Sequence, residues 1–166
     1  MEYRGCIFRD NVNKSIFQKF LCGECNRSLM IVKVVYPVVN KNNDTTNGII
    51  ECMNDIISDI FSVCIEFKVI RITNEGPVLA IVLDRNGKDV KQTAVRLEDK
   101  YVLGKCVDID VYDNLGNVVT RRELGIEERR CFLCDNCLEE CEKRNLHKNE
   151  EIIRYVNKKY KEYIDR

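Results

Sequence analysis

The pattern of hydrophobic and polar positions changes along the chain between a period typical of strands and a period typical of helices. Runs of β-branched or alternating apolar residues predict strands at 28–36, 65–72, 78–83 and 106–112. The strand at 65–72 alternates apolar with charged positions, so we expect it to be half-buried. Apolar residues at helical spacing predict helices at 10–22, 49–61, 90–100 and 149–164. This order of elements predicts an α+β fold with helices packed on a mixed β-sheet, followed by a C-terminal cysteine-rich helical segment.

Polar residues mark the boundaries of several predicted elements. Thr120 and Glu123 have the spacing of a capping box and predict a short helix, and Asn149 is expected to cap the last helix. The polar stretch 40–48 is interpreted first as a flexible, solvated connection. The alternative is a substrate loop in which amides and Lys41 form hydrogen bonds with phosphate or ribose.

Two aspartates lie inside the short apolar strand at 106–112. Side chains two positions apart on a strand point to the same face, so Asp108 and Asp110 should project together. Val107, Ile109 and Val111 should then point the other way, into a core. Aspartates often cap turns, but inside an apolar run they are costly unless they are paired, hydrogen-bonded or bound to a metal. The pair therefore predicts a site for a hard cation such as Mg²⁺, and through it for a polyphosphate.

The composition is that of an ordinary globular protein and excludes several function classes. A length of 166 residues predicts one domain over 1–166, with a core of its own. Lys plus Arg and Asp plus Glu both total 27, so nothing in the net charge indicates a general nucleic-acid or membrane-surface binder. No apolar run is long enough to cross a bilayer, and no signal peptide is visible at the N-terminus. We expect a cytoplasmic protein that binds neither nucleic acid nor membrane.

The chain has ten cysteines, and four of them lie between 131 and 141, close to the only histidine. With Cys137 included, their spacing matches an iron–sulfur motif. Cys131, Cys134 and Cys141 with His147 instead give three thiolates and one imidazole, the ligand set of a closed zinc site. A third interpretation is that the cysteines of this subregion, 131–147, are reduced thiols without a metal. The spacing alone favours zinc slightly over free thiols, and both over an iron–sulfur cluster.

Beyond single motifs, the order and spacing of several groups of residues resemble one known family from about residue 15 onward. The chain resembles the apo-citrate lyase phosphoribosyl-dephospho-CoA transferases, also called the holo-acyl-carrier-protein synthases of citrate lyase. The similar positions are Tyr36-Pro37, Asn40-Lys41, Glu75-Gly76-Pro77-Val78, Lys91, Glu98-Asp99, Gly104, Asp108 to Asp113, Gly116, Arg122 to Gly125, Arg130-Cys131, Cys134-Asp135, Cys141 and His147.

The resemblance implies a nucleotidyltransferase-type reaction. Members of the family join 2′-(5″-triphosphoribosyl)-3′-dephospho-CoA through a phosphodiester to a serine of the apo acyl carrier protein, the γ subunit, of citrate lyase, and pyrophosphate leaves. This chemistry agrees with Mg²⁺ at Asp108 and Asp110, and one of these residues or Glu98 would take the serine proton. The residues that the resemblance indicates for phosphate contacts are Lys41, Lys91, Lys105 and Arg122.

Some positions differ from the family pattern. Lys105 replaces an arginine of the family, which keeps the charge but loses the two-pronged geometry toward phosphate. Cys137 is not a family position, so the matched cysteines are those of the zinc-like set. The alternative function is a non-catalytic zinc-binding or redox module built on 131–147. Such a module would have no need for two carboxylates on one face of a strand.

Overall fold

The fold is built around one four-stranded antiparallel sheet. The structure is a computed structural model and describes residues 26–37, 41–73 and 75–166. The strands are β1 (Arg27–Val34), β2 (Ile65–Thr73), β3 (Gly76–Asp84) and β4 (Val107–Tyr112), in the order β2-β3-β1-β4. The predicted α+β class is confirmed; the pairings among these strands are all antiparallel, where we expected a mixed sheet. The predicted helix at 10–22 lies outside the described residues.

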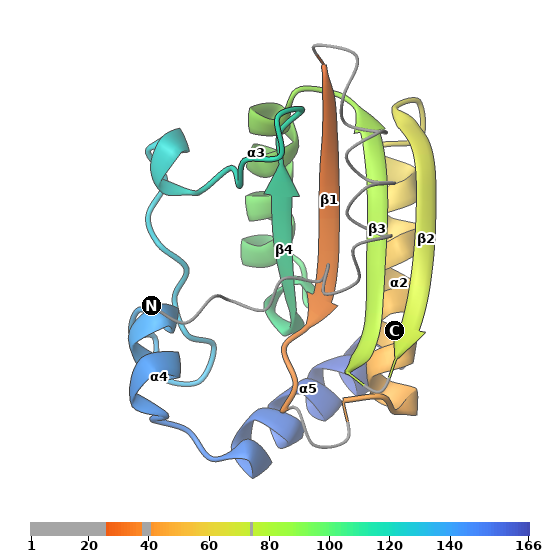
Figure 1. Cartoon of the computed structure of the whole chain (residues 1–166). Helices are drawn as coiled ribbons and strands as arrows, with labels where there is room; N and C mark the ends of the chain where they lie inside the picture. Colours follow the sequence, from red (N-terminus) through yellow and green to blue (C-terminus); the bar gives the residue numbers. More distant parts are fainter. Residues whose placement is uncertain (1–25, 38–40, 74) are drawn as a thin grey trace.

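Helices pack on one face and at one end of this sheet. They are α2 (Asp44–Ile60), α3 (Gly87–Lys100), α4 (Leu138–Arg144) and α5 (Asn149–Ile164), with single 3₁₀ turns η1 (Gly104–Cys106) and η2 (Arg122–Leu124). In Figure 1, α2 and α3 lie behind the sheet, and α5 crosses its lower end, where β1 ends and β4 begins. The cysteine-rich segment with α4 lies beside that same lower end (Figure 1). Among the described helices, none is both long enough and apolar enough to span a membrane.

The main hydrophobic core lies between the sheet and the helices. Every second residue of β1, β3 and β4 faces it, as the alternation predicts. These strand residues are 0–2% exposed: Met30, Val32, Val34, Leu79, Ile81, Leu83, Val107, Ile109 and Val111. A smaller buried cluster, formed by Leu29, Ile31, Ala80 and Val82, lies on the opposite face. The aspartates of β4 belong to this second face, because they alternate with the core residues of that strand.

Two sequence predictions about these elements are wrong in part. The helix predicted at 49–61 begins at Asp44, so the polar stretch 40–48 is half helix and not only a connection. Two reciprocal hydrogen bonds cap its N-terminus. The backbone N–H of Asn43 donates to the Thr46 side chain at 3.1 Å, and the backbone N–H of Thr46 donates to the Asn43 side chain at 3.0 Å. On β2, Phe67 and Val69 are 42% and 40% exposed. Of the expected half-buried face, Ile65 is partly buried against the main core, and the face is exposed from Phe67 onward.

The two other predicted caps have different outcomes. Thr120 and Glu123 form both hydrogen bonds of the capping box, at 3.2 and 3.3 Å, but the helix they open is the single turn η2. At α5, Asn149 is the first helical residue rather than the cap, and the N–H of Lys148 donates to the Glu151 side chain at 2.8 Å. Between η2 and α4, the chain forms turns and an isolated bridge, Arg130 with Cys137, rather than a helix or a strand.

Candidate functional site

Strand β4 presents its two aspartates as predicted. Val107, Ile109 and Val111 are fully buried, and Asp108 and Asp110 are half-buried on the opposite face. The Asp108 side chain is 47% exposed, so a ligand can reach its carboxylate. In the β1–β4 register Lys33 lies opposite Asp108 and Ile31 opposite Asp110. A lysine and an aspartate on one face of adjacent strands place both charges at the lower end of the sheet.

A second lysine lies close to the same carboxylate. The stem of Lys41 packs on Gly76, where a Cβ would lie 2.8 Å from the Lys41 Cγ. Gly76 also has a φ of +98°, which side chains rarely tolerate. Burial and the neighbouring Lys33 lower the pKa of Lys41, while Asp108 and Glu75 act in the opposite direction. Two lysines and at least one carboxylate therefore gather where β1 ends and β3 and β4 begin.

Glu98, which the sequence suggested as a proton acceptor, is instead a buried structural anion. It lies on α3 and is 3% exposed. Its Oε2 pairs with Arg121 Nη2 at 2.7 Å, and its Oε1 lies 3.3 Å from Arg129 Nη1. The same Oε1 accepts a hydrogen bond from the backbone N–H of Ile109 at 3.0 Å. With both oxygens engaged and almost no exposed surface, this carboxylate is in a poor position to take a proton from a substrate.

Lys91 is engaged in a similar way. It lies on α3, is 8% exposed, and donates from Nζ to the carbonyl oxygen of Ile109 at 2.7 Å. Because β4 is an edge strand, the backbone groups of Ile109 that point away from β1 need other partners. Glu98 and Lys91 provide both of them, directly between Asp108 and Asp110. The structure therefore places Lys91 against the β4 backbone and not on the face of the aspartates.

The remaining predicted cations lie near the surface. Lys105 is exposed and lines a cleft of about 260 Å³ together with Arg121 and Arg129. Arg122 is exposed on η2. Arg121 and Arg129, the two arginines that bind Glu98, were missed by the sequence analysis. The sequence shows only two pairs of adjacent arginines, and it does not show which arginine of each pair is buried.

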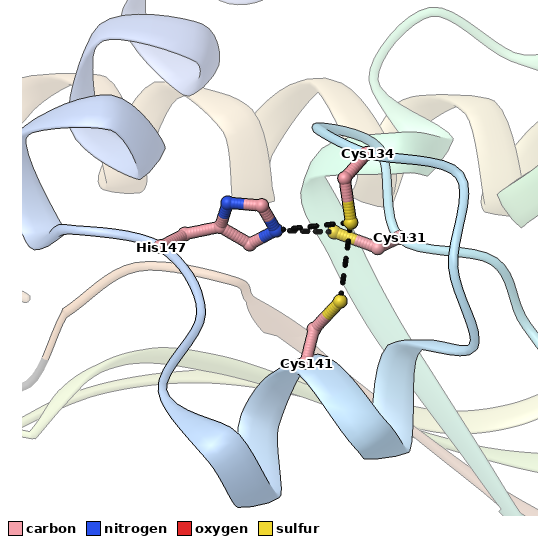
Figure 2. A group of neighbouring side chains, drawn as sticks. All are labelled: Cys131, Cys134, Cys141 and His147. Carbon is pink, nitrogen blue, oxygen red and sulfur yellow. Dashed lines mark hydrogen bonds between the residues drawn. The ribbon is translucent and has the colours of Figure 1, made fainter.

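The zinc-like set predicted from the sequence comes together in space. Figure 2 shows the side chains of Cys131, Cys134, Cys141 and His147 pointing toward one another. The His147 Nε2 lies 3.4 Å from the Cys131 sulfur and 3.2 Å from the Cys134 sulfur, and the sulfurs of Cys134 and Cys141 are 3.3 Å apart. Across the described residues, these four form the one group of at least three candidate metal ligands. Cys137 lies outside the group, which removes the spatial basis for the iron–sulfur interpretation.

A tight turn and a short helix position the ligands. The N–H of Cys131 donates to the carbonyl of Asn136 at 2.7 Å, and Asp135 adopts a left-handed φ of +62° inside this turn. The N–H of Leu133 points to the Cys131 sulfur at 3.5 Å, a typical outer contact of a metal thiolate. Cys141 projects from α4, and the chain turns at Asn145, with a φ of +48°, toward His147. Sequence-local turns therefore create most of this site.

The donor geometry fits a tetrahedral zinc ion. With Zn–S bonds of about 2.3 Å, donor atoms around a tetrahedral ion are about 3.8 Å apart. The four donor atoms lie within 4.8 Å of one another, and the closest pairs at 3.2–3.4 Å need to open only slightly. Hydrogen bonds from Asn136 and Cys141 lower the pKa of the Cys134 thiol to about 7, so its thiolate is accessible at neutral pH. Burial raises the pKa of Cys141 to about 12, and a bound cation would reverse that effect.

Comparison with known proteins agrees with the resemblance seen in the sequence. The family described as apo-citrate lyase phosphoribosyl-dephospho-CoA transferase matches residues 7–163. A protein of that name from Citrobacter koseri is 30% identical over 78 residues, which cover 47% of this chain and 43% of the relative. One from Escherichia coli O1:K1 is 27% identical over 82 residues, covering 49% of this chain and 45% of the relative. These alignments span less than half the length of either relative, whereas the family match covers nearly all of the present sequence. This chain belongs to the apo-citrate lyase phosphoribosyl-dephospho-CoA transferase family.

Proposed function

We propose that the protein transfers 2′-(5″-triphosphoribosyl)-3′-dephospho-CoA to a serine of the apo acyl carrier protein, the γ subunit, of citrate lyase. The serine oxygen attacks the phosphorus that carries the ribose, and a new P–O bond forms. The bond from that phosphorus to the next phosphate breaks, and pyrophosphate leaves. The serine proton passes to a base on the enzyme. The observation that carries this proposal is the family match over residues 7–163, which includes the aspartate strand.

Asp108 and Asp110 are the residues that would hold Mg²⁺. Proteins commonly bind this ion through one or two carboxylates, while substrate phosphates and water complete its shell. The two aspartates meet that description, because they share one face of β4 and Asp108 is 47% exposed. When bound, Mg²⁺ supplies charge neutralisation on the phosphates and on the leaving pyrophosphate.

The lysines at the lower end of the sheet are the best candidates for phosphate contacts. Lys33 lies opposite Asp108 in the strand register, and Lys41 lies near the same carboxylate. Two cations held together repel each other, so an anion between them would relieve that repulsion. Lys105 and Arg122 remain accessible for outer contacts.

One of the two aspartates is proposed as the proton acceptor. Glu98 is not proposed for this role, because its oxygens are occupied by Arg121, Arg129 and the Ile109 N–H. A carboxylate that binds Mg²⁺ through one oxygen retains a second oxygen for the serine hydroxyl. The Cys₃His site is proposed to hold a structural zinc ion, because four protein ligands leave no open position for a substrate.

Pyrophosphate release tests the proposed reaction. The purified protein is incubated with the triphosphoribosyl precursor, Mg²⁺ and apo acyl carrier protein, and pyrophosphate is measured over time. We expect release only when carrier, precursor and Mg²⁺ are all present, and we expect Asp108→Asn/Asp110→Asn to abolish it while keeping the fold and zinc. A wild-type rate in the doubly substituted protein would show that the metal and base assignment is wrong. No release by wild-type protein, beside an active control enzyme, would contradict the proposed substrate pair.

A further inference from the structure

Arg129 connects two parts of the molecule that the reaction scheme leaves separate. Its side chain is 12% exposed, and Nη1 lies 3.3 Å from Glu98 Oε1 and 3.7 Å from Asp108 Oδ1. Its Nη2 donates to the carbonyl oxygens of Gly104 and Lys105 at 3.2 and 3.1 Å. One guanidinium therefore contacts the buried anion of α3, the turn before β4 and the first aspartate of β4.

The backbone of Arg129 belongs to the cysteine-rich segment. It lies two residues before Cys131, and its carbonyl accepts the N–H of Leu138 at 2.8 Å. Leu138 is the first residue of α4, the helix that carries Cys141. The next residue, Arg130, forms a β-bridge with Cys137. The position of Arg129 is therefore set by the same turn and helix that bring the metal ligands together.

This segment has almost no core of its own. Between residues 122 and 149, Cys131 and Cys141 are the two buried side chains, and both are candidate metal ligands. The aromatic ring of Phe132 connects the segment to the rest of the fold, because it stacks on the ring of Tyr155 of α5 with centroids 4.5 Å apart. A segment this small cannot fix its conformation by apolar burial, so a bound metal would supply most of the stabilisation.

At the other end, Glu98 holds the backbone on which both aspartates lie. It accepts the N–H of Ile109, and Lys91 donates to the carbonyl of the same residue. A change in the partners of Glu98 would therefore shift Asp108 and Asp110 through the backbone of Ile109, which lies between them. Arg129 acts on this arrangement twice, through Glu98 and through its direct approach to Asp108.

We propose that Arg129 is a positioning residue that couples the Cys₃His metal centre to the aspartate pair of β4. A metal ion at the cysteines orders the turn, the turn places the guanidinium, and the guanidinium orients Asp108 and supports Glu98. The inference rests on the proposed function, since it assigns Asp108 and Asp110 to Mg²⁺ and the substrate phosphates. It adds that the metal at the cysteines influences the geometry of the Asp108 and Asp110 site, although the two sites share no residue.

Three single substitutions test the placement of the guanidinium. Arg129→Gln removes it, and Arg129→Lys keeps a charge. Arg130→Gln is the matched control, since that side chain is 62% exposed and its contacts, an ion pair with the exposed Glu127 and a hydrogen bond to the Asp135 carbonyl at 3.3 Å, lie at the surface. Affinity for Mg²⁺ with inorganic pyrophosphate is measured by calorimetry, and transfer is measured as kcat and KM at varied Mg²⁺. Outer-shell partners of metal ligands typically contribute about 10- to 100-fold in affinity or activity. We expect Arg129→Gln to lose that much in Mg²⁺-pyrophosphate affinity and kcat with zinc retained, Arg129→Lys to recover part, and Arg130→Gln to match wild type.

Removal of zinc tests the coupling itself. Wild-type protein and Arg129→Gln are each treated with a zinc-selective chelator and assayed again, with circular dichroism to check the fold. If the metal acts through Arg129, its removal should weaken Mg²⁺-pyrophosphate binding in wild type but add little in Arg129→Gln. If zinc removal lowered the affinity for Mg²⁺-pyrophosphate by the same factor in Arg129→Gln as in wild type, the two losses would be independent and the inference would be overturned. Equal affinity in Arg129→Gln and Arg130→Gln would also overturn it. Wild-type protein that binds Mg²⁺-pyrophosphate but does not transfer would contradict the proposed function alone, because the affinities would still test the coupling.

Discussion

Substitution of Glu98 is the most direct perturbation of the packing that supports the aspartate strand. In Glu98→Ala, Arg121 loses its 2.7 Å partner in a position that is only 8% exposed. Arg129 loses one of its two carboxylate partners, and the buried N–H of Ile109 loses its acceptor. Glu98→Gln, by contrast, removes the charge but keeps a side-chain oxygen at nearly the same place.

The expected cost follows from these contacts. Removing one partner of a buried ion pair costs about 3–5 kcal/mol, and an unsatisfied buried N–H costs about 1–3 kcal/mol. Part of this is recovered, because Arg121 keeps Asp99 at 2.9 Å and Arg129 keeps two backbone carbonyls. We therefore expect Glu98→Ala to lower the free energy of unfolding by about 4 kcal/mol, and Glu98→Gln by about 2 kcal/mol. The larger value is a substantial part of a typical domain stability of about 5–15 kcal/mol.

Equilibrium unfolding in urea measures both values. With an m-value of about 2 kcal/mol/M, Glu98→Ala should lower the midpoint by about 2 M and Glu98→Gln by about 1 M. Glu127→Ala is the control, because that side chain is 87% exposed and its ion pair with Arg130 should contribute less than about 0.5 kcal/mol. If Glu98→Ala unfolds at the same urea concentration as the control, Glu98 does not stabilise the fold in the way argued. Equal losses in the Ala and Gln variants would instead show that the charge, and not the Ile109 hydrogen bond, carries the whole effect.

Three further outcomes follow from other parts of the structure. Metal analysis should find about one equivalent of zinc in wild-type protein and little in Cys141→Ser; a folded, active wild type without zinc would make the cysteines simple thiols. Gly104→Ala should destabilise the fold by about 3 kcal/mol in urea unfolding, because a Cβ there would overlap the backbone carbonyl of Leu97, and a wild-type midpoint would refute this. Burial and Lys33 lower the pKa of Lys41. The affinity for phosphate should therefore fall as the pH rises, and this fall should occur at a lower pH than for an ordinary lysine, whose pKa is about 10.4. Lys41→Arg, which stays protonated, should move that fall to higher pH in a KM–pH profile, and unchanged profiles would exclude Lys41 from phosphate binding.

The sequence predicts local features of this fold well where one physical signal dominates. Alternation along 107–112 correctly separates the buried valines and isoleucine from Asp108 and Asp110. The ligand spacing selects the four residues that meet at the metal centre, because three of them lie on one turn and one short helix. In both cases neighbours in sequence are neighbours in space.

Other features depend on contacts that sequence patterns do not reveal. The N-terminus of α2 uses Thr46 where the usual capping pattern has Glu or Gln, so the predicted helix begins five residues later than the observed one. The exposure of Phe67 and Val69 depends on what packs over β2 in the fold, which periodicity along one strand cannot show. The roles of Arg121 and Arg129 depend on Glu98, which lies 23 and 31 residues away in the chain. Long-range ion pairs of this kind decide which charged residues are structural and which are free to bind a ligand.

The intact mass of the carrier protein is the measurement that tests the central claim most directly. Apo acyl carrier protein of citrate lyase is incubated with the protein, the triphosphoribosyl-dephospho-CoA precursor and Mg²⁺, and then weighed by mass spectrometry. We predict an increase equal to the precursor minus pyrophosphate, absent when Mg²⁺ is left out and absent with Asp108→Asn/Asp110→Asn. An unchanged carrier mass with wild-type protein, while a known active enzyme modifies the same carrier in parallel, would contradict the proposed transfer.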